Sequence, residues 1–438
     1  MKVNQVATIL NDIFGEVTGE SALINEDLSN FVDVGRPITD IFGENTNDVD
    51  NYVKSIIDKV GKVVLSEPET GVENLGVVVD NWEYGSMLEK VRADVGDYAE
   101  NDAWQLIAGQ SYDYTEFNPP TVEVKYFNSS TTFELEMSIA REQVKSAFKN
   151  AMNVNRFFSM IENRIRYKKN IAINEMQYRV IVNLIAEKFK SLNGYLNLLE
   201  LYITETGDTA VTATNWKTSK EFLKFCFVKL SLYIKLLSKP KMLYNDGGYV
   251  TNTPESKLNF ILLTDFATAS KAYLQADTYN NEFVTLKGYH EVSEWQGGGE
   301  DDSYTNRSTV YATPASGGDD DIVTLRQDNI IGIMFDREAA AICNQNDRTL
   351  AAPYNPKGEF TNYYYKFDCS YFNDTNENCI VFYIDDYSPV ATEPTDWATS
   401  YTDYFTKNPA TGAYSAVTGA TAPDFDDARY YKKLVPAA

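Results

Sequence analysis

The chain has 438 residues, 43% of them hydrophobic and 13% aromatic, which is ample material for a packed core. Its formal charge of −24, from 39 Lys and Arg against 63 Asp and Glu, opposes general binding to nucleic acid. A single histidine rules out two-His metal sites and argues against Ser-His-Asp and Cys-His catalysis. No apolar run approaches about 20 residues, and polar residues interrupt MKVNQVATILNDIF. We therefore expect no membrane span and no signal peptide, and synthesis in the cytosol.

The charge is distributed unevenly along the chain. Residues 1–120 contain 23 acidic and 7 basic side chains, whereas residues 141–190 contain 4 acidic and 11 basic ones. One interpretation is that the basic segment is a long helix with an ordinary solvated surface. The other is that it meets the acidic N-terminal segment of its own or a neighbouring copy, because complementary charge sets register and association rate. The sequence leaves both interpretations open.

The first 120 residues have few signs of a core of their own. Residues 1–50 alternate short amphipathic pieces with glycine-containing loops and are typical of an extended arm. Residues 48–65 predict a helix, because apolar side chains recur on one face at helical spacing. Residues 71–120 return to loops rich in Gly, Asp and Tyr, with one short strand predicted at Val77–Val79.

Residues 121–169 contain the strongest pattern in the chain. Apolar side chains alternate in residues 121–127 and again in 133–137, and Asn128 to Ser130 suit a turn, so the sequence predicts a β-hairpin. From Ser138, a predicted N-cap, the period becomes helical. The stripe consists of Val144, Ala147, Ala151, Val154, Phe158, Ile161 and Ile165. A helix over residues 138–168 would be about 46 Å long.

The rest of the chain predicts a sheet covered by helices. Helices are expected over residues 171–202 and 217–238, the second ending before Pro240. Two strand-then-helix pairs, typical of an α/β lobe, are predicted at 258–263 with 266–274 and at 330–335 with 337–343. Between them lies an acidic, glycine-rich insertion at 297–318.

Two further strands are predicted near the end of this lobe. Residues 363–369 and 379–384 alternate on either side of a polar turn at 373–378, after another turn at Pro356–Gly358. Beyond Asp385 the chain is rich in Thr, Ala, Pro and Asp, and we expect short strands and loops.

We predict no catalytic, cofactor-binding or metal-binding residues. The four cysteines lack metal-ligand spacing and stand among apolar residues, so buried thiols are expected. Paired carboxylates could supply acid and base or a calcium site, but 63 acidic residues produce such pairs by chance. The pairs are Asp301–Asp302, Asp319–Asp321, Asp385–Asp386 and Asp426–Asp427.

The order of these parts resembles a known family. The stretches that carry the resemblance are MSIAREQVKSAFKNAMNVNRFFSMIENRI, DVDNYVKSIIDKVGKVVL and YNPKGEFTNYYYKFDCSYF. They resemble the major capsid protein of tailed bacteriophages with the Hong Kong 97-type fold, most closely that of the small podoviruses (Salasmaviridae-like group). The resemblance implies an α+β fold with an N-terminal arm, an extended β-hairpin loop, a long spine helix, peripheral strands and an axial α/β lobe.

The resemblance also divides the chain. It implies an arm at 1–71, the extended loop at 72–137, the spine helix and peripheral region at 138–199 and the axial lobe at 200–344, with the acidic insertion at 296–321. Peripheral strands follow at 345–390 and a tail at 391–438, which is too short for an immunoglobulin-like domain. Relatives of this fold can form a Lys–Asn crosslink, but nothing marks Lys90 or Lys125 as reactive, and we predict none.

The implied function is that of a capsid subunit without enzymatic activity. It would assemble in the host cytoplasm into pentamers and hexamers of an icosahedral or prolate virion shell around double-stranded DNA, which it would contact non-specifically. Scaffold, portal and head-fibre proteins are the other implied partners. A carbohydrate-binding or adhesin-like module is the alternative, favoured by the richness in Tyr, Trp and Asn, and an enzyme with paired carboxylates is a further one.

Overall fold

The computed structural model describes most of the chain after residue 150 and only parts of the chain before it. The described residues are 73–79, 88–94, 108, 119–140, 151–191, 193–275, 288–296, 307–312, 325–390, 392–409, 411–419, 421–425 and 429–434. The predicted arm at 1–71, including the helix at 48–65, therefore lies outside the described residues, as does most of the acidic insertion. Within the described part, no helix combines the length and apolarity that a membrane crossing requires.

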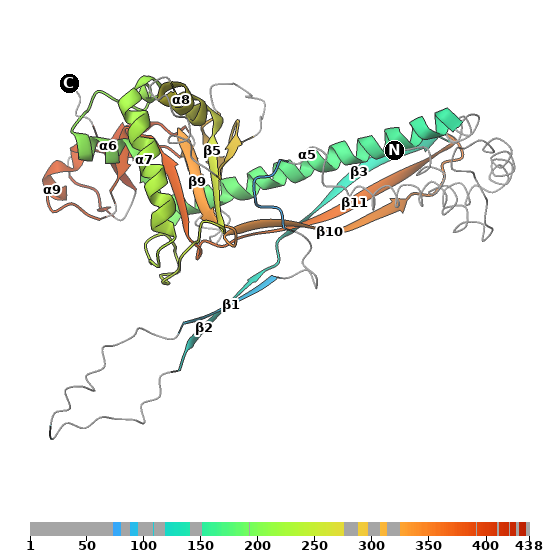
Figure 1. Ribbon diagram of the computed structural model, residues 1–438, viewed down its shortest axis with the longest axis horizontal. Helices are drawn as coiled ribbons and strands as arrows, with labels where there is room; N and C mark the ends of the chain where they lie inside the picture. The colour runs from blue at the N-terminus through green and yellow to red at the C-terminus, as the bar shows by residue number, and fades with distance from the viewer. Residues whose placement is uncertain are drawn as a thin grey trace.

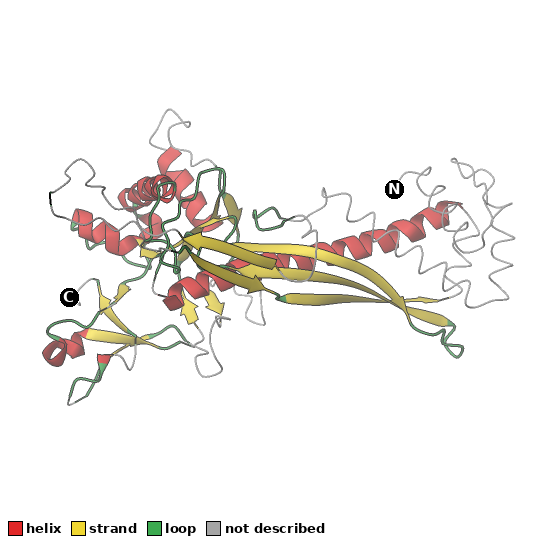
Figure 2. Cartoon of the chain, turned by 90° about the horizontal axis from the view of Figure 1, so that it is seen from below, coloured by secondary structure: helices red, strands yellow, loops and turns green. Residues whose placement is uncertain are grey.

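A long helix and a long sheet extend side by side from a compact lobe (Figures 1 and 2). The helix is α5 (Ala151–Ser191), whose 41 residues give a rod of about 60 Å. The sheet has the order β10-β11-β3, all antiparallel. Its strands are β10 (Ala340–Ala351), β11 (Phe360–Asn373) and β3 (Ser130–Ala140).

The lobe is built on a five-stranded mixed sheet of order β4-β12-β9-β5-β6. The strands are β4 (Tyr195–Asn197), β12 (Cys379–Tyr383), β9 (Ile330–Asp336), β5 (Leu258–Leu263) and β6 (His290–Val292). The lobe's helices are α6 (Leu198–Thr206), α7 (Lys220–Leu237) and α8 (Thr264–Gln275), with the short η2 (Trp216–Thr218).

Both faces of this sheet are covered, which explains why its strands are apolar throughout. On β12, Cys379, Val381 and Tyr383 join the core cluster on the side of α5. Ile380 and Phe382, which alternate with them, join the cluster formed with α6, α7 and α8. The predicted sheet covered by helices is confirmed.

Two smaller sheets complete the compact part. After Asp385, a four-stranded sheet of order β13-β16-β14-β15 has its own core of Trp397, Tyr404, Val417 and Tyr430. Its elements are β13 (Tyr387–Pro389), α9 (Trp397–Ser400), η4 (Tyr401–Asp403), β14 (Tyr404–Lys407), β15 (Tyr414–Ala416) and β16 (Tyr430–Lys433). Strand β7 (Val310–Ala312), which lies within the acidic insertion, pairs with β8 (Leu325–Gln327), which follows it.

The predicted hairpin of 121–127 with 133–137 is wrong in its pairing. Both segments are strands, but β2 (Thr121–Phe127) pairs with β1 (Leu88–Asp94) in a two-stranded ribbon, while β3 pairs with β11. The Ser129 carbonyl already accepts a hydrogen bond from the Tyr371 amide, at 3.0 Å, so the chain joins the long sheet before it can turn back. Alternation identifies strands, whereas partners distant in sequence decide the pairing.

The predicted helix start at Ser138 is also wrong. Strand β3 continues to Ala140, because Ile139 is buried and pairs with Thr361, and the Ser138 hydroxyl donates to Asn362 Oδ1 at 2.7 Å. Helix α5 begins at Ala151 and continues to Ser191, so it unites the predicted spine with the following predicted helix.

Two later predictions change for related reasons. The helix predicted at 337–343 is instead the start of β10, whose Ala340 pairs with Asn373. The late strands at 363–369 and 379–384 are confirmed as strands, but they belong to different sheets. The predicted strand at Val77–Val79 is reduced to a single parallel bridge between Val78 and Ile342.

Candidate assembly site at the base of the β1–β2 ribbon

The β1–β2 ribbon has two chemically different faces. Residues Val91, Val122, Val124 and Tyr126 alternate onto one face, where they are 59%, 55%, 40% and 61% exposed. The opposite face carries Lys90, Arg92, Glu123 and Lys125, which point toward the lobe, whereas Glu89 lies on the apolar face beside Tyr126. Figure 1 shows the ribbon projecting away from both the lobe and the long sheet.

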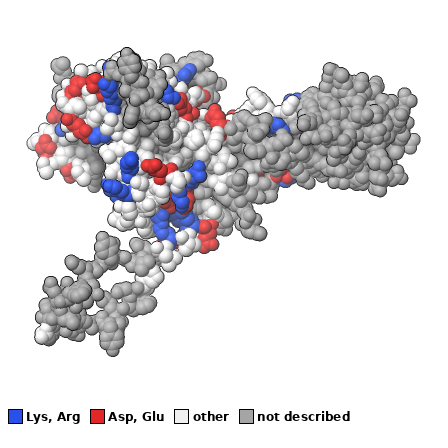
Figure 3. All heavy atoms as spheres, viewed as in Figure 1, with Lys and Arg blue, Asp and Glu red and all other residues white. Residues whose placement is uncertain are grey.

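The charged face is attached to the turn between β11 and β12. Lys90 Nζ lies 2.8 Å from Asp374 Oδ2 and 2.6 Å from Glu377 Oε1. Arg92 also pairs with Glu377, at 2.7 Å, and Lys125 pairs with Asp374, at 3.3 Å. The side chains of Asp374 and Glu377 are only 2% and 6% exposed. Figure 3 shows basic and acidic atoms interleaved where the ribbon meets the lobe.

The pairing stabilises both partners in their charged forms. Burial by itself would raise the pKa of Asp374, but the hydrogen bond from Lys90 and the charges of Lys90 and Lys125 outweigh it and hold the pKa below its ordinary value. Burial likewise opposes the charge on Lys90, but its bonds to Asp374 and Glu377 prevail and raise its pKa. Lys90 therefore keeps its proton.

Tyr249 extends the attachment on the side of the lobe. The Arg92 guanidinium carbon lies 4.9 Å from the centre of the Tyr249 ring, and the Tyr249 hydroxyl donates to Glu123 of β2. The arrangement can hold the ribbon at a fixed angle while its apolar face stays exposed. The described residues contain no group of three or more His, Cys, Asp or Glu that could hold a metal ion.

Two lysines of the basic segment prove to be internal. Lys169 Nζ lies 2.8 Å from Asp347 Oδ2, and Lys188 Nζ lies 3.0 Å from Asp246 Oδ1. Both lysines are almost fully buried, and Lys169 also lies over the ring of Phe367. These ion pairs fix α5 against the long sheet and the lobe, so part of the positive charge serves the fold.

The other residues considered in the sequence have structural positions. All four cysteines are buried free thiols, as predicted, and burial raises the pKa of Cys369 and Cys379 to about 12. Asp385 accepts hydrogen bonds from Tyr414 and Gln327, whereas Asp386 accepts one from the Ala213 amide. The two carboxylates therefore serve different contacts. The pairs at 301–302, 319–321 and 426–427 lie outside the described residues.

The sequence comparisons decide the family. Residues 6–383, most of the chain, match the sequence model of the Phi29-like phage major capsid protein. The chain belongs to this family. It is therefore the major capsid protein of a tailed phage and a structural component of the virion, which confirms the expected function over the adhesin-like alternative. A search of curated protein sequences found no match.

Solved capsid structures resemble this capsid protein at low sequence identity. The capsid structure of Staphylococcus phage Andhra matches with 9% identity and a TM-score of 0.45, over 71% of this chain and 83% of that chain. The capsid of cyanophage P-SCSP1u matches with 11% identity and a TM-score of 0.39, over 70% of this chain and 86% of that chain. The capsid of Ralstonia phage GP4 matches with 10% identity and a TM-score of 0.38, over 72% of this chain and 89% of that chain. The family match, rather than these similarities, carries the assignment.

Sequence reasoning missed the acidic half of the ribbon attachment. The sequence predicts only a polar turn for Asp374 and Glu377, which lie some 280 residues after Lys90. The available signal was the alternation of Lys90, Val91 and Arg92, which places both cations on one face of a strand.

Proposed function

We propose that this capsid protein builds a closed shell by seating the apolar face of its β1–β2 ribbon on a neighbouring copy. The observation that carries this proposal is the exposure of Val91, Val122, Val124 and Tyr126 on a ribbon that projects from the body. A two-stranded ribbon is marginal by itself, and contiguous exposed apolar surface is typical of an interaction site. The buried ion cluster holds this face in position before a partner arrives.

The shell is proposed to consist of pentamers and hexamers and to enclose double-stranded DNA. The formal charge of −24 supports a wall that packaged DNA contacts only non-specifically. Scaffold, portal and head-fibre proteins are proposed as further partners, and assembly is proposed to occur in the host cytoplasm. We assign the chain no catalytic step.

The division of the chain follows the same proposal. Residues 1–71 form the arm, 72–137 the extended loop, 138–199 the spine region, 200–344 the axial lobe, 345–390 the peripheral strands and 391–438 the tail. The fold supports two changes to these boundaries. Strands β4 and β12 belong to the sheet of the axial lobe, and β10 of the long sheet already begins at Ala340.

The ribbon contact is tested by placing charge on its apolar face. The double variant Val122→Asp/Val124→Asp should fold but fail to form particles, because two carboxylates cannot be desolvated in an apolar interface. Electron microscopy and sedimentation measure the particles, and circular dichroism measures the fold. A control variant, Thr402→Asp/Thr418→Asp, adds the same charge to exposed positions just outside the strands of the C-terminal sheet and should assemble. Normal particles from the ribbon variant would exclude the proposed contact.

A further inference from the structure

Among the described residues, an apolar groove remains open between α5 and β3, one of the two edge strands of the long sheet. On β11, Tyr363, Tyr365 and Phe367 are buried beneath α5. Their register partners on β3, which are Met137, Leu135 and Phe133, are only half-buried. The helix therefore covers the middle strand and leaves the apolar side of the edge strand accessible.

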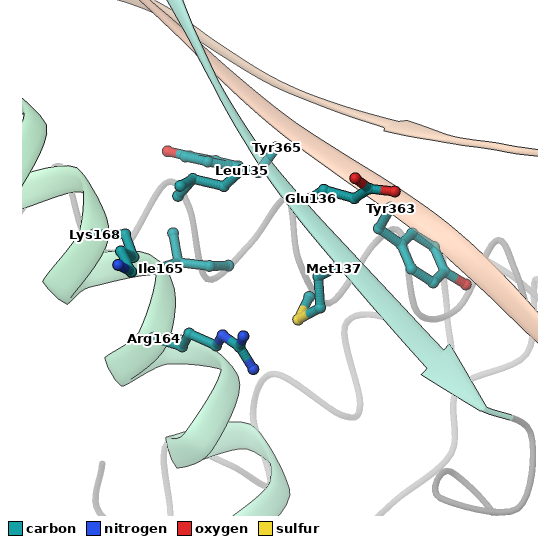
Figure 4. A pocket seen from close by; sticks show the side chains of 8 residues that line it. All are labelled: Leu135, Glu136, Met137, Arg164, Ile165, Lys168, Tyr363 and Tyr365. Atoms are coloured by element: carbon teal, nitrogen blue, oxygen red, sulfur yellow. The ribbon is translucent and has the colours of Figure 1, made fainter.

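The groove has a defined shape and a positive rim. It contains a cavity of about 100 Å³, and its apolar lining is Leu135, Met137, Ile165, Tyr363 and Tyr365. Arg164, Lys168 and the backbone side of Glu136 complete the lining. Figure 4 shows Leu135 and Met137 directed toward α5, whereas Glu136 points to the other side of the strand. Arg164 and Lys168 are both exposed. The chemistry fits an occupant with apolar side chains and negative charge.

We propose that this groove is the docking site for the acidic N-terminal segment of the chain, residues 1–50. This segment contains 10 acidic and 2 basic residues, opposite in sign to the rim. Near its start, Val6, Ile9, Leu10 and Ile13 recur at helical spacing, so a helix here would have an apolar stripe with Asp12 and Glu16 alongside. The stripe would fill the groove, and the carboxylates would meet Arg164 and Lys168.

The attachment of residues 73–79 to α5 brings the segment to the right place. The Glu73 amide donates to Asn174 Oδ1 at 3.1 Å, and the Tyr178 hydroxyl donates to Glu73 Oε2 at 2.6 Å. Asn174 is six residues from Lys168, about 9 Å along the helix. The chain N-terminal to this attachment is long enough to enter the groove of its own copy or of a neighbour.

Disulfide trapping in the full-length protein tests the docking. The four natural cysteines are buried, so introduced thiols on the surface are the accessible ones. Under mild oxidation, Ile13→Cys/Met137→Cys should form a disulfide rapidly, detected by mobility on a non-reducing gel and by mass spectrometry. The matched control Ile13→Cys/Glu136→Cys, with the second thiol on the opposite face of β3, should not. Co-expressing Ile13→Cys and Met137→Cys as single variants shows whether the segment docks within one copy or between copies.

A second variant separates docking from chance proximity. Adding Arg164→Glu/Lys168→Glu to the trapping pair should slow disulfide formation about tenfold, because two attractive surface pairs become repulsive. The same test can be repeated with the first cysteine at Val6 or Leu10 instead of Ile13. If cysteines at positions 136 and 137 are trapped at equal rates with all three, the proposal is overturned. Assembly is scored separately through the ribbon variant, so failure of the docking site leaves the ribbon contact unaffected.

Discussion

At the scale of single residues, the Asp374 carboxylate joins two lysines that face each other across the ribbon. Lys90 and Lys125 are register partners, so their like charges would repel each other without the carboxylate between them. Attachment of the ribbon therefore depends on keeping Asp374 ionised, and Asp374 in turn depends on the two lysines because it is almost fully buried.

Asp374→Asn should loosen the ribbon and lower the free energy of unfolding by about 2 kcal/mol, less than for a fully buried pair because Lys90 is partly exposed. The folded pKa of Asp374 lies below its ordinary value near 3.8. Its stabilisation is therefore complete above that pH and is lost as the pH falls through the folded pKa. Urea unfolding at a series of pH values should show a steeper acid loss in the natural protein than in Asp374→Asn, and equal slopes would contradict this.

Lys169 offers a second prediction, inside the body. Lys169→Met should destabilise the protein by about 3 kcal/mol, since Asp347 would be left as an unpaired buried charge. The double variant Lys169→Met/Asp347→Leu should recover most of this loss, because it removes both charges. Denaturant unfolding of the three proteins measures the effect. A double variant no more stable than the single one would show that the pair is not the cause.

At the scale of elements, α5 connects the two main parts of the molecule. Its C-terminal half contributes Val180, Leu184 and Ile185 to the core of the lobe, and Ile165 and Lys169 lie earlier, against the long sheet. The chain leaves the helix through Gly194, which has a φ of +72° and lies against the Cys379 carbonyl.

Gly194→Ala should be clearly more destabilising than Gly207→Ala. Both glycines have φ near +70°, but a Cβ at Gly194 would lie 2.3 Å from the Cys379 oxygen. A Cβ at Gly207 would meet no described residue within 4 Å beyond its own helix and its chain neighbours. The Gly207 variant should lose about 1 kcal/mol from backbone strain alone, and the Gly194 variant a further 1–3 kcal/mol, roughly, from overpacking. Thermal unfolding compares them, and equal losses would refute the steric account.

At the scale of the whole molecule, positive charge on α5 and negative charge at the N-terminus should make early assembly sensitive to salt. Charges exposed on two copies attract over about 10 Å at 0.1 M salt and over less at higher concentrations. The initial rate, followed by light scattering, should therefore fall as salt rises, and Arg164→Glu/Lys168→Glu should weaken that dependence. A rate independent of salt would remove electrostatic steering while leaving the ribbon contact in place.

Much of the fold could be predicted from periodicity, since the strands at 121–127 and 258–263 and the helix at 220–237 follow local patterns of apolar residues. Pairing could not, because the partners of β2 and β3 lie elsewhere in the chain. Ser138 shows the limit most clearly: it has the chemistry of an N-cap, but β11 supplies Asn362 and holds it in a strand. The ribbon attachment was hidden for the same reason, as its acids are close only in the folded chain.

The continuity of α5 has a mechanical consequence. Over 41 residues it contains neither Gly nor Pro, and it is fixed at the lobe by the ion pair of Lys188 and along the sheet by that of Lys169. Such a strut transmits a load along its axis without buckling at an internal joint. In a wall built from these subunits, each strut would keep its lobe and its long sheet in one fixed geometry under outward pressure from a packed genome, so deformation would fall on the contacts between copies rather than within α5.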